Sequence, residues 1–251
     1  MSKLYKLIRF VPKPVRRFIP EHIRRLYKDS KHPSILIPDL VRQFCQGKGL
    51  EIGPGKLPYG DPRFTEYLDK HTDNKDGMPN PDIVADAYSI PRPDASFDFV
   101  ISSHCLEHCQ NTLKMLNEWL RVLKPGGILF LILPHGDRTL DRHREKTTLQ
   151  HHIDDLNNLT DEPDRSHIDE IMAGWSKNKN FEARKLRYKR LWGADIWDWD
   201  FRFRNDVIHF HVWTQDEMVT ILQYLGLQIV YVAETVPERS DSFLTIARKP
   251  C

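Results

Sequence analysis

The feature that most restricts the fold is a run of six apolar residues, ILFLIL, at positions 128–133. A strand with one solvated face alternates apolar and polar side chains, whereas an unbroken apolar run is typical of a strand covered on both faces. Four further predicted strands precede it, and each has a glycine, an acid or a serine at or next to its end: GKGLEIGPG, FTEYLDK, DIVADA and SFDFVISS. Strands separated by helical patterns predict an α/β fold with a doubly wound, mostly parallel sheet and helices on both faces.

Leucines at helical spacing predict a helix over 104–124, which we expect the sequence Pro125-Gly126-Gly127 to end. A second helix is expected over 214–225, because Thr214 and Glu217 form a capping-box pattern and Gly226 follows as a stop. Three further strands are expected at VIHFHVWT, LQIVYVAE and SFLTIARK.

Residues 135–206 interrupt this rhythm with polar and charged sequence. The segment is too long for a plain connection, so we expect a partly helical insertion or lid within a domain spanning 39–251. A helix within it is expected to begin at Thr147 or Thr148.

Residues 1–38 are expected to form a basic extension, since the first 31 residues carry a net charge of +8 and the remainder carries −6. Apolar residues interleave with the bases, which is typical of a segment resting on anionic lipid. Pro12, Pro14 and Pro20 interrupt any helix there, so a packed extension is the alternative. The acidic remainder does not favour nucleic acid as a partner. Four cysteines without a paired framework, and no secretory pattern, lead us to expect a cytoplasmic protein.

Polar residues and glycines stand at the carboxyl ends of the first four predicted strands. Such ends meet at one edge of a parallel sheet, where ligands of α/β folds bind. A carboxylate at Asp69 can accept both hydroxyls of a ribose, and Asp86 can accept from an adenine amino group. The candidate cofactor-binding residues are Glu51, Gly53, Pro54, Gly55, Asp69, Asp86, Ala87, Ser102 and Ser103.

The succession LEIGPG, Asp69, ADA, SFDFVISSHCLEH and RVLKPGGILFLILP resembles the class I S-adenosylmethionine-dependent methyltransferases over roughly residues 45–135 and 207–249. The resemblance implies a seven-stranded sheet with an antiparallel last strand, supplied by SFLTIARK. It also implies that Gly53 and Gly55 hold the methionine part of the cofactor, Asp69 the ribose, and Asp86 with Ala87 the adenine.

Two local features depart from this pattern or compete with it. The short KLPYGDPRF segment replaces the helix that the family usually has between its first two strands, so the loop must bind through backbone groups alone. The set His104, Cys105, His108 and Cys109 has a spacing that could gather a soft metal such as zinc. The resemblance instead implies that this is a helix start.

Residues after ILFLIL leave the sheet where the acceptor of the methyl group would lie. A hydroxyl acceptor must lose its proton, and histidine is the commonest base near neutral pH. His143 and His135 are the candidate bases, with Asp137 to orient them. The alternative is that these Asp and His residues hold Mg²⁺ against acceptor hydroxyls; the sequence leaves both open.

Tryptophans beside carboxylates in residues 192–200 suit a sugar, which stacks on flat rings and donates hydrogen bonds. Candidate acceptor-binding residues are Asp141, Arg142, Trp192, Trp197, Trp199, His209 and His211. The segment PHGDRTLDRHREKTTLQHH at 134–152, followed by HFHVWT, also resembles bacterial polysaccharide and sugar O-methyltransferases. The expected activity is therefore methylation of a hydroxyl on an oligosaccharide, polysaccharide or glycolipid precursor. A small-molecule or lipid acceptor is one alternative, and an inactive S-adenosylmethionine-binding scaffold is another.

Overall fold

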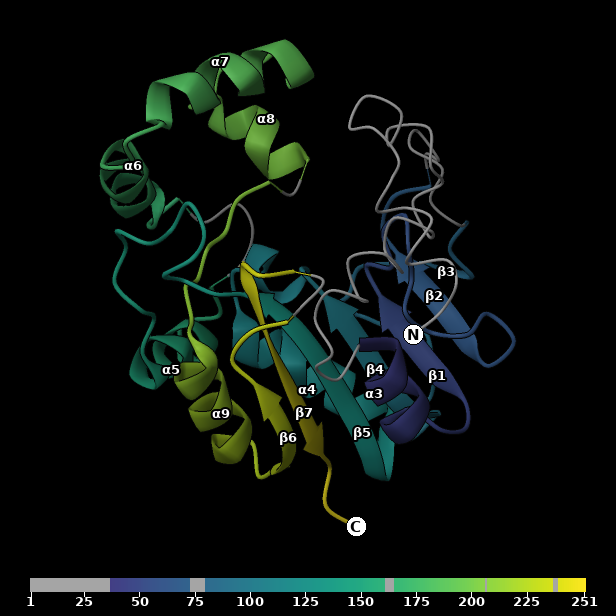
Figure 1. The fold of residues 1–251 in the computed structure, drawn as a ribbon. Coiled ribbons are helices and arrows are strands. Elements are labelled where there is room, and N and C mark those ends of the chain that lie inside the picture. Colours follow the sequence, from purple (N-terminus) through teal and green to yellow (C-terminus); the bar gives the residue numbers. More distant parts are fainter. Residues whose placement is uncertain (1–36, 73–79, 161–164, 206, 237–238) are drawn as a thin grey trace, which may run out of the picture.

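The computed structural model describes residues 37–251 except 73–79, 161–164, 206 and 237–238. The predicted basic extension lies outside the described residues, apart from its last two, which begin helix α3 (Ile37–Phe44). Seven strands form one sheet in the order β3-β2-β1-β4-β5-β7-β6 (Figure 1). Their bounds are β1 Gly49–Ile52, β2 Thr65–Asp69, β3 Ile83–Val84, β4 Phe97–Ser103, β5 Leu123–Pro134, β6 Gln228–Ala233 and β7 Ser242–Arg248.

The direction of the strands confirms the predicted topology. Strands β1 to β5 pair in parallel, whereas β7 is antiparallel to both β5 and β6. The carboxyl ends of the five parallel strands therefore share one edge, at the top of Figure 1, and the C-terminus lies at the other.

Both faces of β5 are buried, as the apolar run predicts. Leu129, Leu131 and Leu133 pack into the core on one face, which α4 (Thr112–Val122), α5 (Leu149–Asn157) and α9 (Gln215–Tyr224) cover. The alternate residues Phe130 and Ile132 pack into a second core, under α3.

Three predicted elements differ from those observed. The helix expected over 104–124 is instead a 3₁₀ turn, η2 (Leu106–His108), followed by α4, because the Asn111 side chain accepts from Lys114 N and starts α4 there. This helix ends at Val122, and Pro125-Gly126-Gly127 lies inside β5. The third strand ends at Val84, two residues before Asp86.

The segment VIHFHVWT is not a strand of the sheet, although Trp213 makes one isolated bridge to His135. Its backbone groups bond elsewhere: Phe210 N donates to Glu107 O, and the Arg144 guanidinium donates to the carbonyls of His209 and Phe210. Backbone groups with these partners do not need a neighbouring strand.

The predicted insertion is helical and divides into two parts. Helix α5, capped by Thr148, packs on the main core. Helices α6 (Ile168–Ser176), α7 (Phe181–Trp192) and α8 (Trp199–Arg204) stand beyond the carboxyl edge of the sheet (Figure 1) and share a small core of their own. No helix in the described part of the chain is long and apolar enough to cross a bilayer.

Candidate functional site

A cavity of about 270 Å³ lies at the carboxyl edge of the sheet, just below the roughly 300–1,000 Å³ range of small-molecule sites. Five of the nine predicted cofactor-binding residues line it: Gly53, Gly55, Asp69, Asp86 and Ala87. The other four, Glu51, Pro54, Ser102 and Ser103, are not among its lining residues.

The turn after β1 is fixed by Glu51 rather than by a helix. The buried Glu51 carboxylate accepts hydrogen bonds from Tyr59 N at 2.9 Å and Gly60 N at 2.7 Å. All residues from β1 to β2 are described, and none is helical, which confirms the departure noted in the sequence. Glu51 therefore holds the loop in place from behind the cavity.

Gly53 and Gly55 both adopt the left-handed conformation, with φ of +64° and +58°. A Cβ at Gly53 would lie 3.3 Å from the Cβ of Cys105, so glycine keeps the backbone close to the cavity wall. This cradle fits a ligand held by main-chain groups, as the amino-acid part of S-adenosylmethionine would be.

The two aspartates are held by short turns at their strand ends. Asp69 Oδ1 accepts from His71 N at 2.9 Å, and Asp86 Oδ1 accepts from Tyr88 N at 2.8 Å. Apolar side chains of Leu68 and Met115 also line the cavity. Carboxylates beside an apolar slot fit a nucleoside, whose sugar donates hydrogen bonds and whose base is flat and apolar on its faces.

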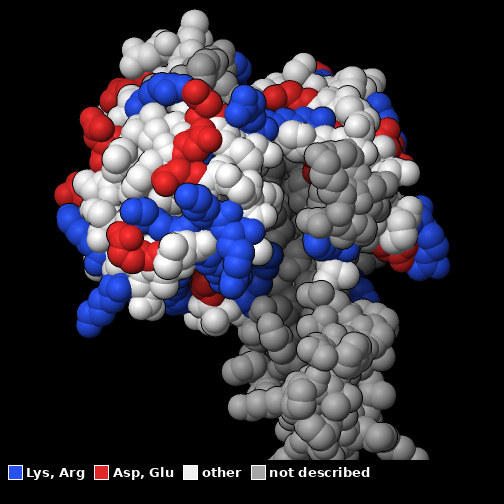
Figure 2. Space-filling view, turned by 90° about the horizontal axis from the view of Figure 1, so that it is seen from above, with Lys and Arg blue, Asp and Glu red and all other residues white. Residues whose placement is uncertain are grey.

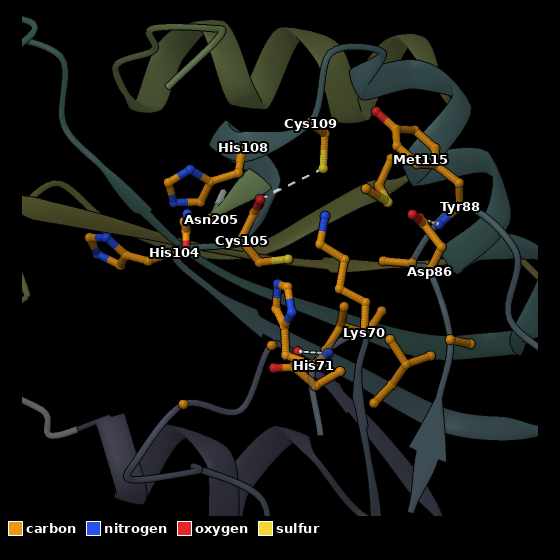
Figure 3. A pocket seen from close by; sticks show the side chains of 17 residues that line it. Lys70, His71, Asp86, Tyr88, His104, Cys105, His108, Cys109, Met115 and Asn205 are labelled. Atoms are coloured by element: carbon orange, nitrogen blue, oxygen red, sulfur yellow. Dashed lines mark hydrogen bonds between the residues drawn. The ribbon is translucent and has the colours of Figure 1, made fainter. Parts of the chain in front are cut away.

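The far end of the cavity is formed by residues that the prediction did not assign to it. Figure 3 shows Asp86, Tyr88 and Met115 at one end, His104, His108 and Asn205 at the other, and Lys70 with Cys105 between them. Asn205 follows α8, so the insertion reaches the cavity. The signal for His104 was its position directly after β4, at a strand end like that of Asp69, the last residue of β2.

A buried carboxyl, Glu107, lies behind the two histidines. Its Oε1 is 3.4 Å from His104 Nδ1 and 3.9 Å from His108 Nε2, and burial raises the pKa of Glu107 to about 7. His104 Nε2 contacts Ser242 Oγ at 2.8 Å, and burial lowers the pKa of His104 to about 2. His108 Nδ1 bonds to the carbonyl of Ile208 at 2.8 Å.

Asp141 and His209, predicted to bind the acceptor, belong to a buried network next to this group. Asp141 Oδ2 is 2.7 Å from His209 Nδ1, and Asp141 Oδ1 is 2.9 Å from Arg144 Nη1 and 2.8 Å from Trp175 Nε1. Burial opposes ionisation of Asp141, but His209 and Arg144 hold its pKa well below the ordinary value. The network fastens the segment at 207–213 to the insertion.

The predicted bases and their orienting acid lie elsewhere and do not line the cavity. His135 is buried, with Nε2 2.8 Å from Glu234 Oε1 and Nδ1 accepting from Asp137 N. His143 is exposed, as is Arg142. Asp137 pairs with Lys146 at 2.7 Å. Asp137 and Asp141 thus already face cationic side chains, and the pair does not fit Mg²⁺, which prefers several oxygen ligands.

The three tryptophans predicted to stack on a sugar differ in their exposure to solvent. Trp197 and Trp199 are half-buried and pack on the insertion core. The ring centroids of Trp197 and Trp175 are 6.3 Å apart. Trp192 is 51% exposed, on the last turn of α7. His211 is buried among other histidines and does not line the cavity.

The surface above this edge carries both signs of charge. Figure 2, seen from above, shows Lys and Arg interspersed with Asp and Glu rather than one broad area of a single sign. The visible face therefore gives no preference for a strongly charged acceptor.

Sequence comparisons cover part of the chain. Residues 61–131 match the family described as "Methyltransferase domain". An ajmaline N-methyltransferase of Rauvolfia serpentina is 44% identical over 57 residues, which is 23% of this chain and 19% of that protein. An uncharacterized protein of Methanocaldococcus jannaschii is 30% identical over 117 residues, 44% of this chain and 56% of the other. The chain thus spans less than two thirds of the length of these curated relatives.

A solved structure from Thermotoga maritima, described as an S-adenosylmethionine-dependent methyltransferase and possible histamine N-methyltransferase, shares the fold. It aligns with a TM-score of 0.51 and 14% identity, covering 94% of this chain and 98% of that one. The residues that match the family contain β2 and β4 and most of β5. The alignment with the solved structure also covers the other strands of the sheet. Residues 61–131 therefore match the methyltransferase-domain family, within a chain that has the fold of this solved structure.

Proposed function

We propose that the protein transfers a methyl group from S-adenosylmethionine to an acceptor that enters the cavity from the side of the insertion. One observation carries the proposal: Gly53, Asp69 and Asp86 stand at or just after the ends of β1, β2 and β3 and line one cavity at the carboxyl edge of the sheet. The methyltransferase-domain match over residues 61–131 supports it. A scaffold that binds no cofactor would not require this set, whereas an inactive S-adenosylmethionine-binding scaffold is distinguished by the methyl-transfer screen below.

Each part of the cavity has a role in this proposal. Gly53 and Gly55 bring backbone N–H groups to the amino-acid part of the cofactor, Asp69 accepts from the ribose hydroxyls, and Asp86 with Ala87 holds the adenine. When bound, S-adenosylmethionine supplies a methyl group on a positively charged sulfur. The remaining task of the chain is to orient an acceptor in line with that methyl and to receive its proton.

His108 replaces His135 and His143 as the candidate proton acceptor, because it lines the cavity and they do not. Its Nδ1 bond to the Ile208 carbonyl fixes the tautomer with the proton on Nδ1, which leaves Nε2 as the basic nitrogen. His104 is less suited, since its Nε2 bonds Ser242 and burial lowers its pKa to about 2. Glu107, 3.9 Å from His108 Nε2, stabilises the proton once it is transferred.

We propose a broad class of acceptor and, within it, one specific acceptor. Any nucleophile that fits beside His108 and Asn205 satisfies the geometry, and the relatives include proteins named for an alkaloid nitrogen and for a malonyl-acyl carrier protein oxygen. A sugar hydroxyl is the narrower proposal. Its support is the exposed ring of Trp192, beside Tyr188 on α7, on which a sugar ring could stack. A small molecule or lipid is the alternative acceptor.

Calorimetric titration with S-adenosylmethionine and S-adenosylhomocysteine tests the cofactor assignment. In Asp69→Asn the side chain keeps its shape but loses the charge that strengthens hydrogen bonds to ribose. We expect affinity to fall by roughly 10- to 100-fold, the equivalent of about 1.5–3 kcal/mol for a hydrogen bond to a charged group. Asp98→Asn is the matched control, because Asp98 lies near the amino end of β4 and binds Lys124.

The outcomes test the binding of the cofactor and the role of Asp69 separately. Failure of the unaltered protein to bind either ligand would refute the proposed function. Binding with equal affinity in Asp69→Asn would refute only the ribose role. Methyl transfer is then screened by mass spectrometry over oligosaccharides, amines and carboxylic acids, and a product with an amine but not a sugar would exclude the narrower proposal.

A further inference from the structure

A second group of chemically active side chains lies apart from the cavity, on the α5 side of the fold. Its members are His151, Asp155, His167 and His211, and one ligand atom from each lies within 4.8 Å of the other three. They come from α5, from the residue before α6 and from the segment at 207–213. Three parts of the chain that are distant in sequence therefore converge on one point.

The spacing within the group matches what a metal ion requires. Asp155 Oδ2 is 3.2 Å from His211 Nε2 and 3.3 Å from His151 Nε2. Ligands at 2.0–2.2 Å from a tetrahedral zinc ion are separated by about 3.3 Å. His151 and Asp155 lie four residues apart on α5, so the helix itself presents both to the same side.

The group leaves buried nitrogen atoms that a metal would satisfy. His167 is only 7% exposed, and its Nε2 makes no hydrogen bond with any described residue. His151 Nε2 is buried as an atom and also lacks hydrogen-bond geometry to the described residues. One carboxylate oxygen cannot serve three imidazoles, and leaving buried polar atoms unpaired costs roughly 1–3 kcal/mol each.

The opposite side of three of the four ligands is held by a further contact, an arrangement that orients metal ligands in proteins. His167 Nδ1 is 3.6 Å from Glu170 Oε2. His211 Nδ1 is 3.2 Å from Thr112 Oγ1, and Asp155 Oδ1 accepts from Thr160 Oγ1 at 3.3 Å. These contacts direct His167 Nε2, His211 Nε2 and Asp155 Oδ2 toward the common centre.

We infer that His151, Asp155, His167 and His211 form a tetrahedral site for a zinc ion. Three imidazoles and one carboxylate are ligands that zinc prefers, whereas Mg²⁺ and Ca²⁺ require mostly oxygen. Four protein ligands leave no open position, so the ion is structural. It joins α5 and the start of α6 to α4 through Thr112, and α4 carries Met115 of the cavity wall.

The inference does not depend on methyl transfer, and its test does not use activity. The full chain is purified without a polyhistidine tag, and its zinc content is measured by mass spectrometry, with about one ion per chain expected. The apoprotein, prepared with a chelator, is then titrated with Zn²⁺ against a chromophoric competitor. Mg²⁺ is expected not to compete. Co²⁺ in place of Zn²⁺ is expected to give the intense visible absorption of tetrahedral cobalt.

Variants identify the ligands. His167→Gln removes one ligand at the helix start, and zinc affinity should fall by more than the roughly 10- to 100-fold that follows loss of an orienting partner. His143→Gln, the same change at an exposed histidine, should bind zinc as the unaltered chain does. A second control is His152→Gln, since His152 is next to the group but accepts from Trp213 Nε1.

Two results would overturn the inference. One is an unaltered chain that takes up no zinc at a ratio of one to one, or whose cobalt form lacks the tetrahedral spectrum. The other is unchanged zinc affinity in both His167→Gln and Asp155→Asn. The spectrum of the unaltered chain is decisive even where a variant does not fold.

Discussion

A single buried side chain, Glu107, should make the stability of the protein depend on pH. Burial raises its pKa from 4.5 to about 7, so between these values the folded state holds a proton that the unfolded state has lost. Stability therefore falls as pH rises through this range and stays lower above it, by on the order of 3 kcal/mol at 1.36 kcal/mol per pKa unit. Glu107→Gln, which cannot ionise, should lose this dependence.

Urea unfolding at about pH 5 and about pH 8 measures this dependence in both proteins. Glu145→Gln is the control, since Glu145 is exposed and the same change there should leave the pH dependence intact. An equal loss of stability toward pH 8 in Glu107→Gln and the unaltered chain would contradict the assignment.

The residues that could be predicted are those whose position follows from the strand pattern alone. Asp69 and Asp86 line the cavity because residues at the carboxyl ends of parallel strands meet at one edge. The position of His135 outside the cavity could not be predicted in this way, because its partner, Glu234, is 99 residues away in the sequence. His108 was missed because its segment has helical spacing, and only the Asn111 cap shows that the helix starts later.

At the scale of elements, α9 is the helix whose start the sequence predicts most directly. Glu217 Oε2 accepts from Thr214 N at 2.7 Å and from Thr214 Oγ1 at 2.5 Å, which fixes the first turn. Thr214→Ala should therefore lower the free energy of unfolding by about 1 kcal/mol. Urea unfolding measures the loss.

Thr220→Ala on the same helix is the matched control, because Thr220 is exposed and its hydroxyl donates to Asp216 O within the helix. Its effect should stay within about 0.5 kcal/mol. Equal losses at the two positions would mean that the cap does not stabilise the helix beyond ordinary propensity.

The segment at 207–213 shows why some elements could not be predicted. Alternation of apolar residues with His209 and His211 is typical of a strand, yet the segment forms only one isolated bridge within the described residues, from Trp213 to His135. Whether such a segment joins a sheet depends on which donors and acceptors reach it, and here Arg144 and Glu107 supply them. A pattern of side chains carries no information on partners of that kind.

At the scale of the whole molecule, the insertion and the rest of the domain should unfold as one unit, because a buried network fastens the insertion to the segment at 207–213, and Phe210 N of that segment donates to Glu107 O just after β4. Asp141 and Arg144 are 3% and 1% exposed, and together they bind Trp175 of α6 and the backbone of residues 209–210. Removing one charge of a buried pair leaves the other uncompensated, which typically costs about 3 kcal/mol or more.

Asp141→Asn should accordingly lower the free energy of unfolding by about 3 kcal/mol, whereas Asp137→Asn, at a 58% exposed carboxylate paired with Lys146, should change it by less than about 1 kcal/mol. Tryptophan fluorescence and far-ultraviolet circular dichroism, followed in the same urea titration, should give one coincident transition for the unaltered chain. A loss in Asp141→Asn no larger than in Asp137→Asn would show that the network does not stabilise the join. Separate transitions would show that the insertion unfolds independently of the sheet. Asn205, which lines the cavity, would then belong to a less stable unit.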